Sequence, residues 1–417
     1  MRCSCVKLLI YSLVILLVVL QFVHWIMLSL LDEKTTKRQA QTWSGKLHRS
    51  LLTLQEKRQS ETKIDWSGQY KIHQHYDVSH YRESTSTIAN DDLTIVTQCS
   101  VNHLYHLIEL SEEWEGPISV AVFTTEDQIQ IADSAILILH ECFQKIRTNV
   151  AFHLVYPFTF HEINENRQQI LEMFDVPCKN IMQVLKNHNL LTQNYDFSGI
   201  AYPNNLLRNV ARVGVQSTFI FVIDIDMIPS KHLRADFLSF IQRTSSSGSI
   251  TNNNAVYVVP AFELFDSFNN IPTTKQEILD NFDDGVRPFY IEVCQKCQYP
   301  TDYKNWCKIK PTEGLNVAYS RNWVDPWEPF YISSNDVPLY DERFKQYGFN
   351  RISQVCELHV AGYTFSVLDN AFVLHKGYKT KTGFHSNKDK ENLKNKYLFR
   401  QFKEALLIKY PESSRRC

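Results

Sequence analysis

The longest uninterrupted apolar run lies near the amino terminus. From Leu8 to Leu31 the sequence has no formally charged residue, and the acidic pair Asp32-Glu33 follows directly. A helix of this length, at about 1.5 Å per residue, covers a hydrocarbon core of ~30 Å. No small-residue cleavage pattern follows it, as a signal peptide would require. We therefore predict a cytosolic tail over residues 1–7, a transmembrane signal anchor over residues 8–31 and the body of the protein in a lumen. A cleaved signal peptide and a buried core helix are the alternatives.

The pattern changes twice after this run. Residues 32–90 are polar, rich in Lys, Gln, Ser and Thr, and without sustained apolar periodicity. Such a segment is typical of a stem that separates a folded domain from a membrane. From residue 91 apolar runs become regular, and no internal linker interrupts them. We predict one globular domain over residues 91–417.

Within this domain, β-branched runs alternate with segments of helical periodicity. The first half predicts strands at 93–97, 118–123 and 150–155, separated by helices at 103–114 and 127–143. The second half predicts strands at 255–260, 315–319 and 363–368, and a last helix at 390–410. Strands that alternate with helices at this spacing favour an α/β fold with a mainly parallel, helix-flanked sheet.

Composition and charge narrow the class of protein. Of the 417 residues, 44% are apolar, which is enough for a buried core. Lys and Arg total 44 against 45 Asp and Glu, so the formal net charge is -1. A nucleic-acid-binding protein would show a basic excess, and we exclude that class.

The cysteines agree with a lumenal domain. Eight of them follow residue 90, and in an oxidising lumen they can form up to four disulfides whose pairing the sequence does not give. A zinc site at Cys294, Cys297 and Cys307 is the alternative, but no fourth ligand has convincing spacing. No Asn-x-Ser/Thr sequon occurs, which is unusual for a lumenal protein.

Two carboxylates follow an all-apolar run at the centre of the chain. Residues Phe219–Ile223 predict a buried strand, and Asp224 and Asp226 come directly after it. Their i, i+2 spacing points both side chains to the same face of an extended chain. Ligands of open α/β sheets bind at the carboxyl ends of strands, and paired carboxylates there suit Mg²⁺ or Mn²⁺. A metal so placed can bridge a diphosphate and neutralise its charge. A pair of solvated loop aspartates is the alternative.

Two further segments carry candidate ligand-binding groups. We predict a helix that begins near Pro203 and could direct Arg208 toward a phosphate or carboxylate. That Arg208 is a solvated surface arginine is the equally favoured alternative. Near the end of the chain, His375 offers an imidazole as a third Mn²⁺ ligand, and Lys376 beside it can meet diphosphate oxygens. A structural histidine after a strand is the alternative there.

Several ordered motifs resemble glycosyltransferase family 49, which contains the second catalytic domain of the LARGE xylosyl- and glucuronyltransferases. The resemblance extends over residues 91–417. It rests on Trp114–Ser119, Tyr202–Arg212, Asp224–Pro229, Val259–Glu263, Trp327–Pro329, Asp341–Asn350 and Glu357–Leu358.

This resemblance implies a GT-A fold and a Golgi enzyme that depends on Mn²⁺, with Mg²⁺ as a substitute. It further implies an inverting transfer of glucuronic acid from UDP-glucuronate. The implied acceptor is the terminal xylose of the O-mannosyl glycan on α-dystroglycan, primed in this way for extension by a LARGE-type enzyme. The family's metal motif falls on Asp224 and Asp226, its late histidine falls on His375, and Arg208 is assigned to the donor.

Inversion requires a base that takes the proton from the acceptor hydroxyl. Many inverting GT-A enzymes have an acidic residue after a Tyr-Gly turn, but this chain has Asn350 and Arg351 there. Glu328, beside aromatic residues able to stack on a sugar, is our first candidate for the catalytic base. Asp341 and Glu342 are the alternatives.

Three other functions remain open at this point. The same metal and diphosphate chemistry can serve a different donor, as in a β-1,3-N-acetylglucosaminyltransferase of poly-N-acetyllactosamine synthesis or a xylosyltransferase. A non-catalytic Golgi partner of another glycosyltransferase is a second alternative. A metal-dependent phosphohydrolase is a third, although a two-metal site needs more acidic or histidine ligands than the sequence offers.

Overall fold

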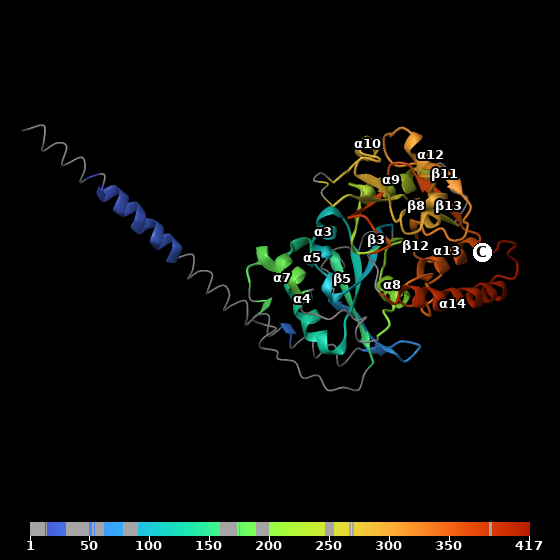
Figure 1. Cartoon of the computed structure of the whole chain (residues 1–417), viewed down its shortest axis with the longest axis horizontal. Coiled ribbons are helices and arrows are strands. Elements are labelled where there is room, and N and C mark those ends of the chain that lie inside the picture. Colours follow the sequence, from blue (N-terminus) through green and yellow to red (C-terminus); the bar gives the residue numbers. More distant parts are fainter. Residues whose placement is uncertain are drawn as a thin grey trace, which may run out of the picture.

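The computed structural model describes most of the chain beyond residue 90 and parts of what precedes it (Figure 1). The described residues are 13, 15–30, 50–51, 54, 62–77, 91–158, 173–174, 176–188, 200–246, 254–266, 268, 271–382 and 386–417. Residues 15–30, inside the predicted anchor, are helical. Across these described ranges, no helix is both long and apolar enough to span a bilayer. The anchor over residues 8–31 extends beyond them at both ends and stays a prediction.

A large mixed sheet forms the centre of the described domain. Its strand order is β1-β2-β5-β4-β3-β6-β12-β8-β13-β11. In chain order the strands are β1 (Lys63–Ile64), β2 (Tyr70–Asp77), β3 (Leu93–Ser100), β4 (Ile118–Phe123), β5 (Val150–Pro157), β6 (Phe219–Val222), β8 (Ala255–Val259), β11 (Val317–Arg321), β12 (Phe330–Ser334) and β13 (Thr364–Leu368).

The first half of this sheet follows the prediction. Strand β3 is parallel to both β4 and β6, and β4 is parallel to β5. In the second half, β12 runs antiparallel to both β6 and β8, which makes the sheet mixed. The α/β class and the mainly parallel sheet of the first half are thereby confirmed.

The sheet also begins earlier in the chain than predicted. Strand β2 pairs antiparallel with β5, and β1 pairs with β2, although both lie in the segment assigned to the stem. The residues of β2, Tyr-Lys-Ile-His-Gln-His-Tyr-Asp, are mostly polar. An antiparallel strand near a sheet edge needs few apolar residues, so its pattern resembles that of a linker. The remainder of the stem prediction lies outside the described residues.

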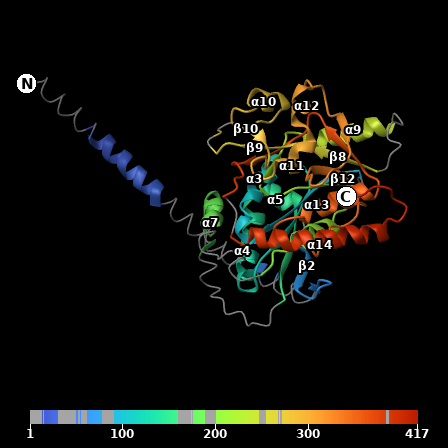
Figure 2. The same cartoon turned by 45° about the vertical axis from the view of Figure 1, so that its right-hand side comes forward.

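Helices cover both faces of the sheet. They are α3 (His106–Glu113), α4 (Ile129–Cys142), α5 (Gln144–Asn149), α7 (Ile181–His188), α8 (Asn204–Val213), α9 (Leu233–Ser246), α10 (Lys275–Asp280), α11 (Gln295–Gln298), α12 (Tyr303–Lys308), α13 (Asn350–Val360) and α14 (Lys388–Lys409). Figure 1 shows α4, α5 and α7 on one side of the domain and α13 and α14 on the other, and Figure 2 shows α14 along its length across the lower part of the domain. The predicted helices at 103–114, 127–143 and 390–410 correspond to α3, α4 and α14.

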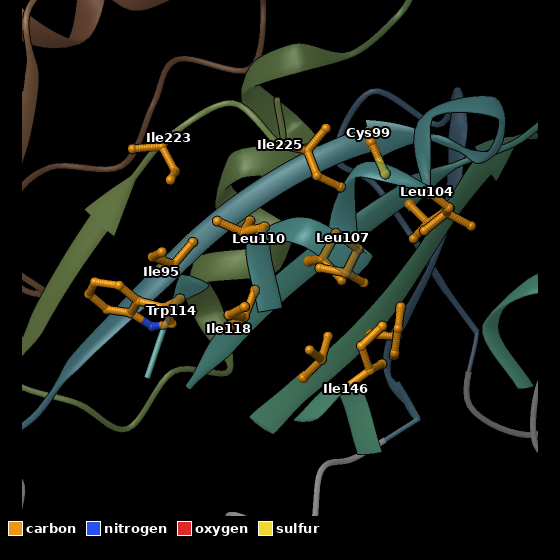
Figure 3. Packing of buried hydrophobic residues seen from close by; sticks show 14 of the residues in the cluster. Ile95, Cys99, Leu104, Leu107, Leu110, Trp114, Ile118, Ile146, Ile223 and Ile225 are labelled. Atoms are coloured by element: carbon orange, nitrogen blue, oxygen red, sulfur yellow. The ribbon is translucent and has the colours of Figure 1, made fainter. Parts of the chain in front are cut away.

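The two faces of strand β3 belong to different apolar clusters. Ile95 packs with Leu107, Leu110 and Trp114 of the α3 region, as Figure 3 shows. Its neighbour Val96 packs on the opposite face in the cluster that contains the apolar residues of α8. Strands buried on both faces read as continuous apolar runs, which explains why the sequence predicted them well.

A second, smaller sheet with the order β10-β9-β14-β7 lies beside the first. Its strands are β7 (Met227–Pro229), β9 (Ala261–Leu264), β10 (Val286–Pro288) and β14 (Val373–Lys376). Three chain segments leave the large sheet and enter the small one after a few residues, namely β6 to β7, β8 to β9 and β13 to β14. The connection between β6 and β7 carries Asp224 and Asp226.

Three disulfides join described parts of the chain: Cys142–Cys178, Cys294–Cys297 and Cys356–Cys417. Among the described cysteines, Cys99 and Cys307 are free thiols. The zinc alternative at Cys294, Cys297 and Cys307 is wrong in this structure, because two of its three thiols are bonded to each other.

Candidate active site

The two aspartates lie in a tight turn between the sheets. The backbone N–H of Met227 donates to the carbonyl of Asp224 at 3.0 Å, so the chain turns here instead of staying extended. The alternating residues Ile223 and Ile225 point into the core, as Figure 3 shows. The side chains of Asp224 and Asp226 retain 32% and 28% of their exposure. Both carboxylates thus stay accessible, whereas the buried side chains of Ile223 and Ile225 anchor the turn.

Asp226 is held by His375, which lies in strand β14, and by Lys379, which follows that strand. Because β14 pairs with β7, His375 lies opposite Met227. The imidazole Nε2 of His375 is 3.1 Å from Asp226 Oδ2, and Lys379 Nζ is 3.3 Å from the same oxygen. Burial alone would raise the pKa of Asp226, but the His375 bond and the Lys379 charge outweigh it and hold that pKa well below its ordinary value. Asp226 is therefore ionised at any physiological pH.

Asp224 faces two arginines. Arg351, in the first turn of α13, places Nη2 2.7 Å from Asp224 Oδ2. Arg208 of α8 places Nη2 3.5 Å from Oδ1. Burial opposes ionisation here too, but Arg351 and then Arg208 keep the pKa of Asp224 below its ordinary value.

Arg208 is not a surface arginine. Only 4% of it is exposed, and its Nη1 donates to the side-chain oxygens of Asn205 and Asn350, each at 2.9 Å. Arg212, four residues later, is equally buried and bonds to the 335–338 segment. The solvated-pair alternative is therefore wrong. The structure places Arg208 behind Asp224, and its contact with a donor stays a prediction.

The side chains around the turn have the chemistry of a divalent-cation site. His375 Nδ1 lies 2.7 Å from the carbonyl of Gly377. A carbonyl only accepts, so Nδ1 carries the proton, which is how metal-binding histidines are commonly oriented. With Asp224 and Asp226, this gives the oxygen and imidazole donors that Mn²⁺ accepts. In the ranges that the structure describes, no three His, Cys, Asp or Glu side chains already converge as a metal cluster. The residues present fit a cation, and their role as its ligands stays a prediction.

A cleft of about 800 Å³ opens beside Asp226 and His375. Its far wall is α3 with the residues just before it, and it has the size of a site for a nucleotide or similar ligand. The lining residues are Tyr105, His106, Ile108, Glu109, Glu112, Met182, Lys186, Asp226, Ile228, His375 and Lys376. Lys376 lines the cleft, and its ammonium pairs with Glu109 of α3. Its predicted contact with a diphosphate is untested.

Glu328 lies in a segment that hydrogen bonds hold in place. Its backbone N–H donates to the carbonyl of Cys297 at 2.9 Å, and the indole of the fully buried Trp327 donates to Thr301 Oγ1 at 2.9 Å. Burial raises the pKa of Glu328 to about 7, against the lowering effect of Arg351 and Arg208. A carboxylate with such a pKa can both accept and release a proton near neutral pH.

The two alternative bases are occupied otherwise. Asp341 accepts several hydrogen bonds from Arg343, including one from Nη2 at 2.5 Å. Glu342 Oε1 accepts from Asn209 Nδ2 at 2.9 Å. These contacts give Asp341 and Glu342 structural roles.

Sequence reasoning did not assign three residues that organise this site. Arg351 was noted only because it replaces an acid, and it is the strongest partner of Asp224. Lys379 lies three residues after Lys376 and faces Asp226. Glu263, with no exposed surface, accepts from Arg287 Nε at 2.6 Å and from the backbone N–H groups of Tyr290 and Lys379 at 3.1 Å. The only available signal for Glu263 was its place in the Val259–Glu263 motif.

Comparison with known proteins identifies the family of this chain. The family model described as glycosyl-transferase for dystroglycan matches residues 92–411. The chain belongs to this family. It is 43% identical to beta-1,4-glucuronyltransferase 1 of Danio rerio and 40% identical to that of Homo sapiens, in each case over 85% of this chain and 83% of the relative. It is 28% identical to the xylosyl- and glucuronyltransferase LARGE1 of Danio rerio, over 74% of this chain and 34% of that protein.

Solved structures resemble the chain more distantly. Staphylococcus aureus TarS aligns with 78% of this chain and 40% of its own, at a TM-score of 0.36 and 12% identity. GalNAc-T7, solved with UDP, GalNAc and Mn²⁺, aligns with 78% of this chain and 51% of its own, at a TM-score of 0.36 and 9% identity.

Proposed function

We propose that this family member is an inverting β-1,4-glucuronyltransferase with a GT-A fold. It transfers glucuronic acid from UDP-glucuronate to the terminal xylose of an O-mannosyl glycan such as that of α-dystroglycan. The product is then extended by a LARGE-type glycosyltransferase. The proposal is supported by the 40–43% identity to beta-1,4-glucuronyltransferases over most of both chains. The observation that carries it is the turn that presents Asp224 and Asp226 beside His375 at a nucleotide-sized cleft.

In this proposal, Asp224, Asp226 and His375 hold Mn²⁺, for which Mg²⁺ can substitute. The ion supplies positive charge to the diphosphate of the donor. The chain's own cations assist: Arg351 and Arg208 orient Asp224, while Lys379 and Lys376 offer ammonium groups to donor phosphate or carboxylate oxygens. This role for Lys379 rests on its 3.3 Å approach to Asp226 Oδ2.

Glu328 acts as the base. Its carboxylate takes the proton from the acceptor hydroxyl while the oxygen of that hydroxyl bonds to the anomeric carbon of glucuronate. The bond from that carbon to the UDP oxygen breaks at the same time, and UDP leaves with the electron pair. Attack on the face opposite UDP inverts the anomeric configuration. The pKa of about 7 suits Glu328 to this proton transfer.

The test is product analysis with the purified full-length chain. A panel of UDP-sugars is offered with an aryl β-xyloside acceptor, with Mn²⁺ and with a chelator. We expect a glucuronyl-β-1,4-xyloside from UDP-glucuronate alone, and none after chelation. Turnover of UDP-N-acetylglucosamine without turnover of UDP-glucuronate would contradict the proposal.

We also place the folded domain in the Golgi lumen, behind a single-pass type II anchor. The three disulfides support an oxidising compartment. Protease digestion of sealed Golgi vesicles tests this location. The domain should be protected until detergent is added, and degradation in sealed vesicles would contradict a lumenal domain.

A further inference from the structure

An ion pair reaches across the cleft that contains Asp226 and His375. Lys376, the last residue of β14, pairs through its ammonium with the carboxylate of Glu109 in α3. The two residues lie 267 positions apart in the sequence, and both line the cleft of about 800 Å³. The contact therefore joins the small sheet to the opposite wall of the cleft.

The Glu109 end of this pair is held by the core. Leu107 and Leu110, which flank Glu109 in α3, are buried in the apolar cluster that contains Ile95 of β3 (Figure 3). The side chain of Glu109 itself retains 33% of its exposure. A helix whose apolar side is anchored in this way presents the carboxylate at a fixed place on the cleft wall.

The Lys376 end has a fixed backbone and a movable ammonium. Strand β14 is parallel to β9, and Lys376 is paired with Leu264 in that ladder. The preceding residue is His375, whose Nε2 lies 3.1 Å from Asp226 Oδ2, so Lys376 is next in sequence to a proposed cation ligand. A long flexible stem carries the ammonium, and 47% of the side chain is exposed. The ammonium can thus exchange partners without any movement of the sheet.

A diphosphate is a stronger partner for Lys376 than Glu109 is. A partly exposed ion pair stabilises a protein only weakly, because solvent screens it and both side chains lose freedom. A diphosphate carries more negative charge, and its several oxygens accept charge-assisted hydrogen bonds. Breaking the Lys376–Glu109 pair therefore costs little, but this cost reduces the affinity of any ligand that uses Lys376.

Glu112 provides a comparison on the same wall. It also lies on α3 and lines the cleft, but its carboxylate pairs with Lys145 Nζ at 3.1 Å. Lys145 belongs to α5, outside the described lining of the cleft. The two glutamates bring the same charge to the cleft, and of the two it is Glu109 that occupies a lysine of the cleft.

We propose that Glu109 is an internal competitor of the nucleotide diphosphate for the ammonium of Lys376. This inference rests on the proposed function and adds a regulation of its donor site. Before a nucleotide binds, Glu109 holds the ammonium. When the diphosphate enters, Lys376 turns to its oxygens, and when UDP leaves, the ammonium returns to Glu109. The pair thereby lowers donor affinity and favours release of the product.

The test is calorimetry of UDP binding, in the presence of Mn²⁺, to the full-length chain and to its Glu109→Gln variant. The substitution removes the competitor for Lys376, so we expect the Kd for UDP to fall about fivefold. Glu112→Gln is the matched variant, because it removes one negative charge from the same wall. It measures the general effect of charge, and its Kd should fall by less than about twofold.

A double-mutant cycle shows whether the effect passes through Lys376. Lys376→Met should weaken UDP binding, because it removes the ammonium that the diphosphate uses. In the Lys376→Met background, Glu109→Gln should no longer lower the Kd. Circular dichroism of each variant measures whether it is folded.

Three results would overturn the inference. They are an equal fall in Kd for Glu109→Gln and Glu112→Gln, no fall for Glu109→Gln, and an undiminished fall for Glu109→Gln when Lys376 is absent. Failure of the proposed function is recognised separately, because UDP binding is measured without sugar or acceptor. A chain that shows the competition but transfers no glucuronate from UDP-glucuronate contradicts the proposed function alone.

Discussion

His375 Nε2 lies 3.1 Å from Asp226 Oδ2, and the two residues are 149 positions apart in the sequence. Their contact exists because β14 and β7 are paired strands of the small sheet. The proton on Nδ1 is directed at the Gly377 carbonyl, so Nε2 is the atom that a cation would meet.

Asp226→Asn should reduce transfer by about a thousandfold, because a metal contributes several kcal/mol to the stabilisation of charge in the transition state. Folding should persist, since the turn is anchored by Ile223 and Ile225 and not by the carboxylate. Initial rates with UDP-glucuronate measure the loss of transfer, and circular dichroism measures whether the variant is folded. Asp280→Asn, an exposed carboxylate on α10, is the matched control. Near-normal transfer by Asp226→Asn would refute the metal role.

Transfer should decline as the pH falls through about 7. The reason is that Glu328, whose pKa burial raises to about 7, becomes protonated and can no longer accept a proton. Arg351 lowers that pKa, so Arg351→Met should shift the acidic limb of the pH profile to higher pH. The profile of kcat/KM between pH 5 and 9 measures this. A limb at the same pH in Arg351→Met would show that another group is titrating.

Glu328→Gln should be inactive and yet more stable than the wild type at pH 8. The folded-state pKa of Glu328 is raised, so the folded protein binds this proton more tightly than the unfolded chain does. Stability from this group is therefore complete below the unfolded pKa and declines as the pH rises toward 7. Removing the charge should raise the free energy of unfolding by on the order of 1 kcal/mol at pH 8. Urea denaturation at pH 5 and pH 8 tests the sign, and a variant less stable than the wild type at pH 8 contradicts it.

Glu263→Gln should destabilise the fold by about 2–4 kcal/mol, because it leaves the Arg287 guanidinium without its buried carboxylate. Its matched control is Glu292→Gln, which removes the exposed partner of the same arginine. That control should change stability by less than about 1 kcal/mol. Urea denaturation midpoints of the two variants measure these losses of stability. An equal loss in both would contradict a stabilising role of the buried Glu263–Arg287 pair.

The sequence predicted the strands that are buried on both faces. It missed a strand that forms only because it pairs with a strand distant in the sequence. Strands β3 and β4 form continuous apolar runs and were located within a few residues. Strand β2 was missed because its polar pattern gains meaning only from its pairing with β5.

The candidate site divides in a similar way. Asp224, Asp226 and His375 were proposed as ligands because carboxylates or an imidazole at the end of an apolar strand stand out locally. Arg351 and Lys379 meet these aspartates across 127 and 153 positions of sequence, and no local pattern encodes such contacts. The buried environment of Arg208 likewise depends on Asn350, which is 142 positions away.

The pairing of β7 with β14 in the small sheet sets the distance between Asp226 and His375. Met227 and His375 are cross-strand neighbours, so the gap between Asp226 and the imidazole follows from the repeat of a β-ladder. The length of the segments that connect β7 to β14 does not enter this gap. A change of length in a connecting segment therefore leaves the relative positions of Asp226 and His375 intact as long as the two strands stay paired.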